Sequence, residues 1–566
     1  MNNVSHCVWN YQSRKMKTKL TFLSACFIGL GLVGCGSESG HPKPGLVALE
    51  KQGELRVGNT VSANSRCNDC EQIQYTWMLD MNRNGIWGDS VFVDGQLVSD
   101  KEIQGQRYTL SSDEYGVKAR LEMQYQVEGK AKSDFVIYQP VLVEKIFSNN
   151  FGDVAFLKSN GELVTWAYGQ IDTHDGIEKV FESDYGLAAQ DTTGKLITWQ
   201  RSAMPSDMAP IYHAKSFHSN QGGGFAVIQG DGSVVTWGDH YSGGDSADVQ
   251  TQLVDVESIY GAKYAFAALK NDKTVVAWGG GDAGDSNQVQ ADLTDVEMII
   301  ENERSFAVIK ADNTVVTWGE LNYGGYTKSF RDELENILNV FSNRTHFPDT
   351  YDNGTDFIAI KKDGAVISWG ADTYSDLRDV RRQSIPGAKE IFSTWGAYVA
   401  LTESGNVKVW GSERLGGNST SVSHQLTQIK TIVPNANAFT ALKEDGSVVS
   451  WGFDNCGGTN NATAGITDIV QVEATTCAFA AVRADGSLVA WGDQFGGGDL
   501  SSATGALSRT ILLKAAEDKF LALQQDGTVA AWGLDVVNDA EAWQLLQAYL
   551  EPRDEEIESS IWSVFL

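Results

Sequence analysis

Short apolar runs that end in a tryptophan recur along most of this chain. Residues 438–452 and 478–492 show the unit most completely: an apolar strand, a polar turn, and a second strand that closes on Trp-Gly. A third apolar stretch precedes each hairpin, for example at 256–259 and 429–432. Runs this short, rich in valine and separated by glycine-containing turns, predict β-strands and exclude a helical repeat. Each unit is therefore expected to form at least three short strands.

The tryptophans that close these units are regularly spaced. Successive gaps are 33, 38, 41, 40, 51, 41, 41, 40 and 41 residues. The ten tryptophans are Trp166, Trp199, Trp237, Trp278, Trp318, Trp369, Trp410, Trp451, Trp491 and Trp532. A fixed period in this range is typical of stacked or radial repeats. It predicts an all-β fold in which residues 141–538 form a β-propeller of about ten repeats, and it makes the tryptophans from Trp237 onward structural repeat positions.

Glycine stands at two fixed places in the unit. Five residues before the tryptophan, eight of the ten units place glycine, and the exceptions are Lys273 and Asn313. Glycine there supplies the positive φ of a tight hairpin, and asparagine tolerates it, so Lys273 should cost some stability. A second glycine recurs six residues after the tryptophan, in loops expected to cluster on one rim: Gly243, Gly284, Gly324, Gly416, Gly457 and Gly497. These loops are interpreted as turns rather than ligand loops.

The pattern Ala-Leu-x-x-Asp-Gly-x-Val-x-x-Trp-Gly resembles the regulator-of-chromosome-condensation repeat family. Its forty-residue spacing is closer to that of the short-bladed bacterial relative that inhibits β-lactamases. The resemblance covers about residues 143–535. It implies a β-propeller, typically seven-bladed, whose face loops bind other proteins. Ten units exceed seven, so a single larger ring and a seven-bladed ring with extra units packed outside it both stay open. Repeat six also carries an insertion near 343–353.

The amino terminus has the pattern of an export signal. Basic residues at 14–19 precede the apolar run 20–34, which is too short to be read as a spanning helix. Leu32-Val33-Gly34-Cys35 then resembles the lipobox of bacterial lipoproteins. The resemblance implies a signal peptide at 1–34, a lipid on Cys35 that anchors the protein to a membrane, and a flexible tether over 35–45. Gly36 in place of aspartate implies the outer membrane of a Gram-negative bacterium, with its surface and periplasmic faces both open.

Residues 46–140 lack the repeat and show alternating strand patterns around Trp77. They resemble the bacterial immunoglobulin-like modules of cell-surface proteins, which implies a small β-sandwich that acts as a stalk. Cys67 and Cys70 have the spacing of a redox or metal motif, but an exported compartment favours a simple disulfide. Residues 80–85 copy the opening of a calcium loop, yet its twelfth position holds Val91 where such a loop needs glutamate. A polar hairpin turn is favoured there.

A second pair of cysteines lies among the repeats. Cys456 is in the loop after Trp451, and Cys477 starts the hairpin of the next repeat. A disulfide that links neighbouring blades is expected outside the cytoplasm. The tail at 539–566 breaks the repeat pattern, and we expect a short amphipathic helix followed by a closing strand.

Charge excludes one class of partner. The chain of 566 residues carries 44 basic and 73 acidic side chains, a net charge of −29. Removing the four basic residues of 1–34 leaves 40 against 73, which gives −33. Such a surface repels phosphate backbones, so no nucleic-acid partner is expected.

Motifs that carry chemistry are scarce. The eight histidines are scattered, and we find no metalloprotease helix motif, no phosphate-binding glycine loop, and therefore no catalytic residue, metal or cofactor to predict. Three functions remain: a cell-envelope adhesion or interaction protein that binds a protein or glycan on the propeller face, a periplasmic scaffold or protein inhibitor, and a carbohydrate-active propeller. The first is favoured.

Overall fold

The computed structural model describes sixteen segments of the chain: residues 45–52, 60–81, 90–93, 96–109, 117–138, 140–167, 169–327, 331–343, 357–370, 383–459, 462–504, 507–525, 527–534, 536, 540–550 and 553–554. The predicted signal peptide and Cys35 lie outside these residues. Most of the predicted calcium-like turn, the repeat-six insertion and the proposed terminal strand also lie outside them. Nearly all described residues in regular structure are in β-strands, so the prediction of an all-β architecture is confirmed.

The first part of the chain forms two antiparallel sheets over a common core. One sheet has the order β1 (Gly45–Gln52), β2 (Thr60–Asn68), β7 (Arg107–Thr109). The other has the order β6 (Lys101–Gln104), β3 (Glu71–Leu79), β8 (Ala119–Val127), β9 (Lys130–Tyr138), and β4 (Ser90–Val93) pairs with β5 (Gln96–Ser99). Val61 from the first sheet and Trp77 from the second are both fully buried in this core. Its assignment as an immunoglobulin-like module remains a prediction.

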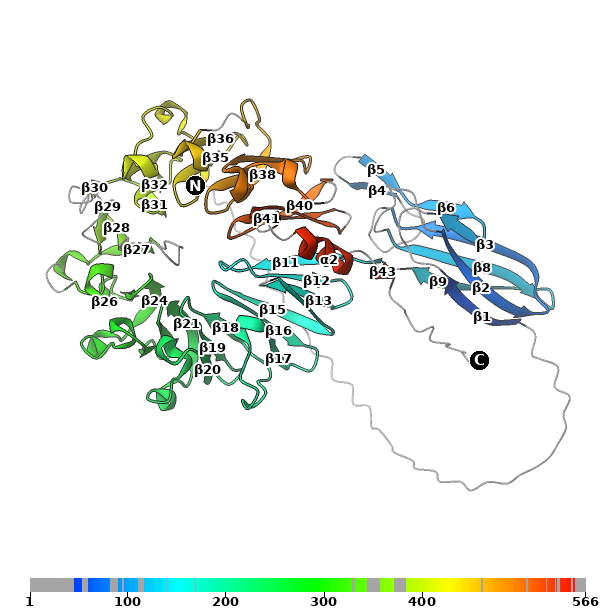
Figure 1. The fold of residues 1–566 in the computed structure, drawn as a ribbon, viewed down its shortest axis with the longest axis horizontal. Helices are drawn as coiled ribbons and strands as arrows, with labels where there is room; N and C mark the ends of the chain where they lie inside the picture. Colours follow the sequence, from blue (N-terminus) through cyan, green and yellow to red (C-terminus); the bar gives the residue numbers. More distant parts are fainter. Residues whose placement is uncertain are drawn as a thin grey trace, which may run out of the picture.

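Ten consecutive small sheets follow, one for each tryptophan of the series (Figure 1). The first five are β11 (Val143–Ser148), β12 (Val154–Lys158), β13 (Leu163–Ala167), β14 (Gln170–His174); β15 (Ile177–Ser183), β16 (Gly186–Asp191), β17 (Leu196–Thr198); β18 (Ser216–Ser219), β19 (Gly224–Ile228), β20 (Val234–Gly238); β21 (Val256–Ala262), β22 (Ala265–Lys270), β23 (Val275–Gly279); β24 (Val296–Glu301), β25 (Ser305–Lys310), β26 (Val315–Gly319).

The other five are β27 (Ile337–Ser342), β28 (Phe357–Lys361), β29 (Ala365–Trp369), β30 (Gln383–Ser384); β31 (Ala388–Ser393), β32 (Ala397–Thr402), β33 (Val407–Gly411); β34 (Ile429–Pro434), β35 (Ala438–Lys443), β36 (Val448–Gly452); β37 (Ile469–Ala474), β38 (Ala478–Arg483), β39 (Leu488–Gly492); β40 (Thr510–Ala516), β41 (Lys519–Gln524), β42 (Val529–Gly533). We call each sheet a blade and number the blades from one to ten in chain order.

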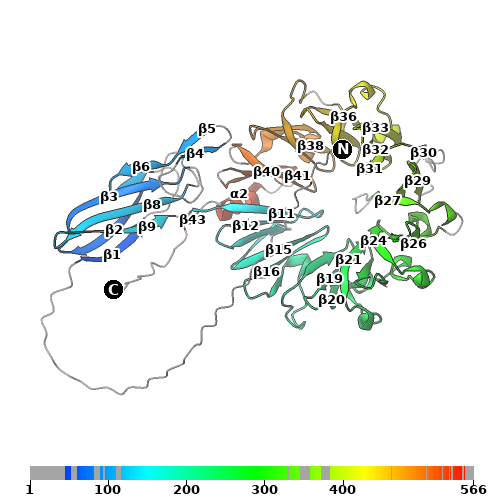
Figure 2. The same cartoon turned by 180° about the vertical axis from the view of Figure 1, so that it is seen from behind.

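The ten blades close into one ring (Figures 1 and 2). The first strand of each blade, or in one case the second, contacts the first strand of the next, and β40 of blade ten contacts β11 of blade one. Helix α2 (Ala540–Leu550) reinforces this last joint, because Trp543 packs on Trp166 with ring centroids 4.9 Å apart. Beyond the helix, β43 (Arg553–Asp554) pairs with β10 (Pro140–Val141). The structure therefore has one ten-bladed ring, not a seven-bladed ring with units outside it.

Each joint between blades is a hydrophobic layer closed by a tryptophan. In blades three to ten the tryptophan lies across from an aromatic residue of the second strand, as Phe266 and Trp278 do with centroids 5.3 Å apart. In six of these blades the indole N–H donates to a main-chain carbonyl of the preceding blade's loop at 2.9–3.2 Å. The donor and acceptor pairs are Trp237–Ser202, Trp278–Gly243, Trp318–Ala283, Trp369–Gly324, Trp451–Gly416 and Trp532–Gly497.

The glycines six residues after the tryptophan do more than form turns, because some of them pack directly against the next blade. Gly416 lies against the ring of Phe439 in the next blade, and a Cβ added to Gly416 would approach that ring to 2.7 Å. Gly497 stands in the same relation to Phe520. A side chain at either position would push the loop off the next blade and break the tryptophan hydrogen bond.

The hairpin turn glycines adopt the expected conformation. All ten turn positions have φ between 63° and 83°, including Lys273 at 66° and Asn313 at 63°. The prediction that this position needs a positive φ is confirmed. A lysine held there is strained, because its Cβ crowds the following carbonyl.

Replacing Lys273 by glycine should stabilise the ring. The substitution relieves about 1 kcal/mol of left-handed backbone strain. It also removes an ion pair with Glu257 in which both side chains are more than two-fifths exposed, and such pairs contribute little. The measurement is the melting temperature of the ring transition. As the matched control, Gly446→Lys should lower that temperature, because its Cβ would lie 2.7 Å from the Thr467 carbonyl oxygen. Equal melting temperatures for both variants and the parent would contradict the strain argument.

Trp451 and Trp491 provide a paired test of the joint. Both are buried against a phenylalanine, but only Trp451 donates a hydrogen bond, whereas the indole N–H of Trp491 has no partner among the described residues. Trp451→Phe should therefore destabilise the ring by about 1–2 kcal/mol more than Trp491→Phe does. Thermal unfolding of the two variants gives the comparison, and equal losses would show that burial alone sets the stability of the joint.

Candidate functional site at one mouth of the ring

The loops that join the first strand to the second in each blade gather at one mouth of the ring. We call them the mouth loops: residues 149–153, 184–185, 220–223, 263–264, 303–304, 394–396, 435–437, 475–477 and 517–518. Main-chain hydrogen bonds link them from blade to blade. On one side Trp395 N donates to Ala436 O, Ala436 N to Thr476 O, and Thr476 N to Glu517 O, at 3.0–3.3 Å.

The opposite side of the mouth repeats this linkage. Gly222 N donates to Lys263 O at 2.8 Å, and Lys263 N donates to Glu303 O. Asn150 N donates to Asp184 O at 2.9 Å near the joint between blades one and two. Because these bonds use the backbone, this blade-to-blade linkage does not depend on the side chains of the mouth loops.

A second set of loops follows the tryptophans on the same face. We call them the tryptophan loops: residues 238–244, 279–284, 319–325, 411–417, 452–458 and 492–498. Buried side chains of the mouth loops hold them, because Asn220 donates to Ser242 O at 2.7 Å and Thr394 donates to Leu415 O at 2.8 Å. Asn435 makes the same bond to Cys456 O at 2.8 Å. The face is thus fixed by hydrogen bonds that do not depend on its exposed side chains.

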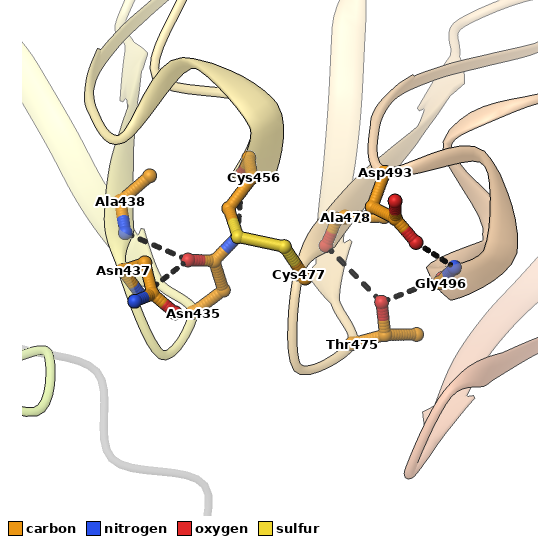
Figure 3. The surroundings of a disulfide bond; sticks show 9 residues. All are labelled: Asn435, Asn437, Ala438, Cys456, Thr475, Cys477, Ala478, Asp493 and Gly496. Atoms are coloured by element: carbon orange, nitrogen blue, oxygen red, sulfur yellow. Dashed lines mark hydrogen bonds between the residues drawn. A yellow bond between two sulfur atoms is a disulfide. The ribbon is translucent and has the colours of Figure 1, made fainter.

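The predicted disulfide between Cys456 and Cys477 is confirmed, with Cα atoms 4.3 Å apart (Figure 3). It joins the tryptophan loop of blade eight to the mouth loop of blade nine. Asn435 and Thr475 flank it, each bonding its own blade's tryptophan loop (Figure 3). The covalent link spans the joint at which the Trp491 N–H has no partner among the residues that the structure describes.

The other predicted disulfide, between Cys67 and Cys70, is also confirmed, and it joins the end of β2 to the start of β3. Its cysteines pack against the core of the sandwich. Among the described residues no group of three or more histidine, cysteine, aspartate or glutamate side chains is placed to hold a metal ion. In the same residues no helix is long and apolar enough to cross a membrane.

A cavity of about 270 Å³ opens between the mouth loops. Three aromatic side chains, Phe151, Tyr185 and Trp395, contribute to its wall. The other lining residues are mostly neutral: Asn150, Gln221, Asn343, Ser393, Thr394, Pro434, Asn435, Ala436, Ala474, Thr475, Thr476, Ala515 and Glu517. Its polar surface therefore offers amides, hydroxyls and backbone groups rather than a cluster of charges.

The cations near the mouth are engaged by the protein itself. Arg201 lies 3.7 Å from the centre of the Phe151 ring and donates to Gln221 O at 3.1 Å. Lys263 bonds Glu303 at 2.8 Å, and Arg304 bonds Glu320 at 3.3 Å.

The acid of the first mouth loop, Asp153, is buried. Burial raises the pKa of Asp153, while the hydrogen bond from Asn149 at 2.8 Å and the charge of Lys519 act in the opposite direction. Of the histidines, burial lowers the pKa of His218 to about 4, so it is neutral at pH 7. His213 lies at a turn with φ of 55°.

Apolar side chains protrude from the tryptophan loops. Tyr241, Leu321 and Phe495 are 56%, 65% and 56% exposed, at closely corresponding positions of blades three, five and nine. Tyr241 also packs against Tyr264 of the next mouth loop, with centroids 5.5 Å apart. Sequence reasoning named the loops but treated them as turns and missed these residues. The signal was the variation three or four residues after the tryptophan, between the recurring Trp-Gly and the recurring loop glycine.

Comparison with known proteins gives a fold likeness alone. No family model and no curated protein matches the chain. Among solved structures, the ectodomain of the Physcomitrella patens receptor kinase CR4 is 13% identical, covers 49% of this chain and 72% of its own, and has a TM-score of 0.30. Human WBSCR16 is 14% identical, with coverage of 58% and 93% and a TM-score of 0.28. Prp20p of Saccharomyces cerevisiae is 13% identical, with coverage of 59% and 90% and a TM-score of 0.28. Superpositions this loose carry no argument about function.

Removing the inter-blade disulfide should destabilise the ring. Closing a loop with 21 residues of separation stabilises the folded state by about 3 kcal/mol, so Cys456→Ser combined with Cys477→Ser should lower the melting temperature of the ring clearly. Thermal unfolding with and without dithiothreitol provides the measurement, and the double variant should no longer respond to the reductant through this joint. The paired change Cys67→Ser and Cys70→Ser is the control and should leave the ring transition in place. An unchanged ring transition in the first variant would show that the joint is held without the bond.

Proposed function

We propose that this protein is a non-catalytic binding module of the bacterial cell envelope that recognises a protein partner through the face made by its mouth loops and tryptophan loops. The observation that carries the proposal is the exposure of Tyr241, Leu321 and Phe495 at corresponding positions on loops held rigid from below. Large apolar side chains on a preorganised surface bind a partner with little loss of conformational freedom. A protein partner is favoured over a glycan for this outer part of the face, because the protruding groups include leucine as well as aromatic rings.

Catalysis has little support from the same face. Glu303 and Glu320 are each paired with a cation, and Asp153 is buried against Asn149. These carboxylates serve the loops in which they lie. A carbohydrate-active enzyme would need a pair of carboxylates facing a shared substrate space. The carbohydrate-active function is therefore the least supported of the three.

The proposed cellular location is based on the amino-terminal segment. A lipid on Cys35 would anchor the chain, and the sandwich at 46–140 would then separate the ring from the membrane. Both disulfides support an exported location, because cytosolic thiols are kept reduced. On the outer leaflet the ring would meet neighbouring cells or surfaces. On the periplasmic side the same face would serve as a scaffold or inhibitor, which is the alternative function.

Photo-crosslinking in intact cells tests both the proposed binding face of the ring and the proposed cellular location. A photoreactive residue at Leu321 should give adducts with a discrete partner, whereas one at Asp445, in a hairpin turn at the other end of the strands, should give none. Protease added to intact cells should remove the ring and its adducts, and Cys35→Ser should abolish display on the cell surface. Equal adducts at both positions would overturn the proposed face. Protection from protease until the outer membrane is opened would exclude adhesion and select the periplasmic scaffold.

A further inference from the structure

We propose that the mouth cavity is a binding site for a neutral saccharide, separate from the protruding residues of the tryptophan loops. The inference deepens the proposed function, since it assigns a ligand class to the centre of the same face. It rests on which side chains of the cavity are committed to the fold, which are not, and what charge the wall carries.

The deep polar side chains of the cavity are committed to the fold. Asn435 donates to Cys456 O and accepts from Ala438 N, and Thr475 donates to Gly496 O at 2.7 Å. Ser393 donates to the Asn343 side chain at 3.1 Å. These residues hold the loops in place and have little capacity left for a ligand.

The groups nearer the opening differ. The side-chain amides of Asn150 and Gln221 and the hydroxyl of Thr476 make no hydrogen bond to any other described residue, although the backbones of all three are fixed by the fold. An amide offers both donors and an acceptor, and a hydroxyl does the same. Ligands with closely spaced hydroxyl groups match such a wall better than ligands with a single kind of polar group.

The aromatic residues supply the apolar part of the site. Trp395 and Tyr185 are only partly buried and border the cavity. Tyr185 packs on Phe151 with ring centroids 5.2 Å apart, and Phe151 carries Arg201 at 3.7 Å from its centre. The C–H face of a pyranose ring packs on an aromatic surface while its hydroxyls bond the neighbouring amides. A volume of about 270 Å³ is near the small end of ligand pockets and suits one or two sugar units.

Charge selects a neutral sugar. Among the described residues that line the cavity, Glu517 is the one side chain that ionises, and no lysine or arginine is among them. Arg201 lies close by but is held by Phe151 and Gln221. An acidic sugar would face Glu517 within a protein of net charge −29. A single carboxylate can accept hydroxyl hydrogen bonds but offers no pair for hydrolysis, so the site would bind its sugar without cleaving it.

Titration calorimetry of the full chain in detergent provides the test. The probes are maltose and N,N′-diacetylchitobiose as neutral disaccharides, the glucosamine dimer as the matched cationic sugar, and a glucuronate-containing disaccharide as the anionic one. We expect a neutral disaccharide to bind with a dissociation constant below about 1 mM, and the anionic probe to bind at least about tenfold more weakly. Amylose and chitin, offered as polymers, separate recognition of a polysaccharide from recognition of a free sugar.

Variants of cavity residues test whether the saccharide binds in the mouth cavity. Trp395→Ala should weaken it about tenfold and Gln221→Ala severalfold, since each removes one contact of the kind described. Tyr212→Ala is the control, because Tyr212 is an exposed aromatic residue outside the cavity, next to a hairpin turn, where it forms a bridge with Lys195. Melting temperatures show that each variant is folded. Affinity unchanged in both cavity variants would overturn the proposal.

Other outcomes also decide the matter. Tighter binding of the cationic or anionic probe would overturn the neutral-saccharide assignment, as would no binding of either neutral disaccharide at about 10 mM. The adduct formed at Leu321 is independent of this result. Its persistence without saccharide binding would refute this inference alone, and saccharide binding without the adduct would refute only the proposed protein partner.

Discussion

The ring depends on the hydrogen bond by which a tryptophan of one blade reaches the loop carbonyl of the blade before it. The bond is short, between 2.9 and 3.2 Å wherever it occurs among the described residues. It requires the loop to lie directly on the aromatic pair of the next blade, and Gly416 and Gly497 permit that approach because any Cβ would strike the ring. At these six joints the tryptophan and the loop that it bonds set the distance between neighbouring blades. The indole N–H groups of Trp166, Trp410 and Trp491 have no partner among the described residues, so those joints do not use this bond.

The same bond explains why one face of the ring can vary without loss of fold. Several tryptophan loops are held from behind by the next tryptophan, and several are held by a mouth-loop asparagine or threonine such as Asn220 or Thr394. Next to those fixed points the chain presents exposed side chains that no hydrogen bond of the ring requires: tyrosine at 241, leucine at 321 and phenylalanine at 495. Variation confined to such positions is what a recognition surface requires, since affinity can change there while stability does not.

Much of this could be predicted from the sequence, because the repeat places each structural residue at a fixed distance from its tryptophan. The hairpins, the positive φ at Lys273 and the cysteine pairing of 456 with 477 all follow from local spacing. The closed ring of ten does not, because closure depends on how Trp166 of blade one meets Trp543 of the terminal helix, some 377 residues later. The mouth cavity was equally hidden, since Asn150, Gln221 and Trp395 come together only when blades one, three and seven are arranged around one axis.

The joint between blades eight and nine is consistent with the proposed exported location. There the indole N–H of Trp491 is unpaired among the described residues, and the Cys456–Cys477 bond links the same loop to the same blade. An unpaired buried donor costs about 1–3 kcal/mol, and a disulfide across this loop offsets a penalty of that size. In a reducing compartment the joint would lose the bond and keep the penalty. The pair is therefore suited to an oxidising compartment, and this argument is independent of the lipobox-like segment that ends at Cys35. Two features far apart in the chain, one in its first residues and one in its core, support the same location.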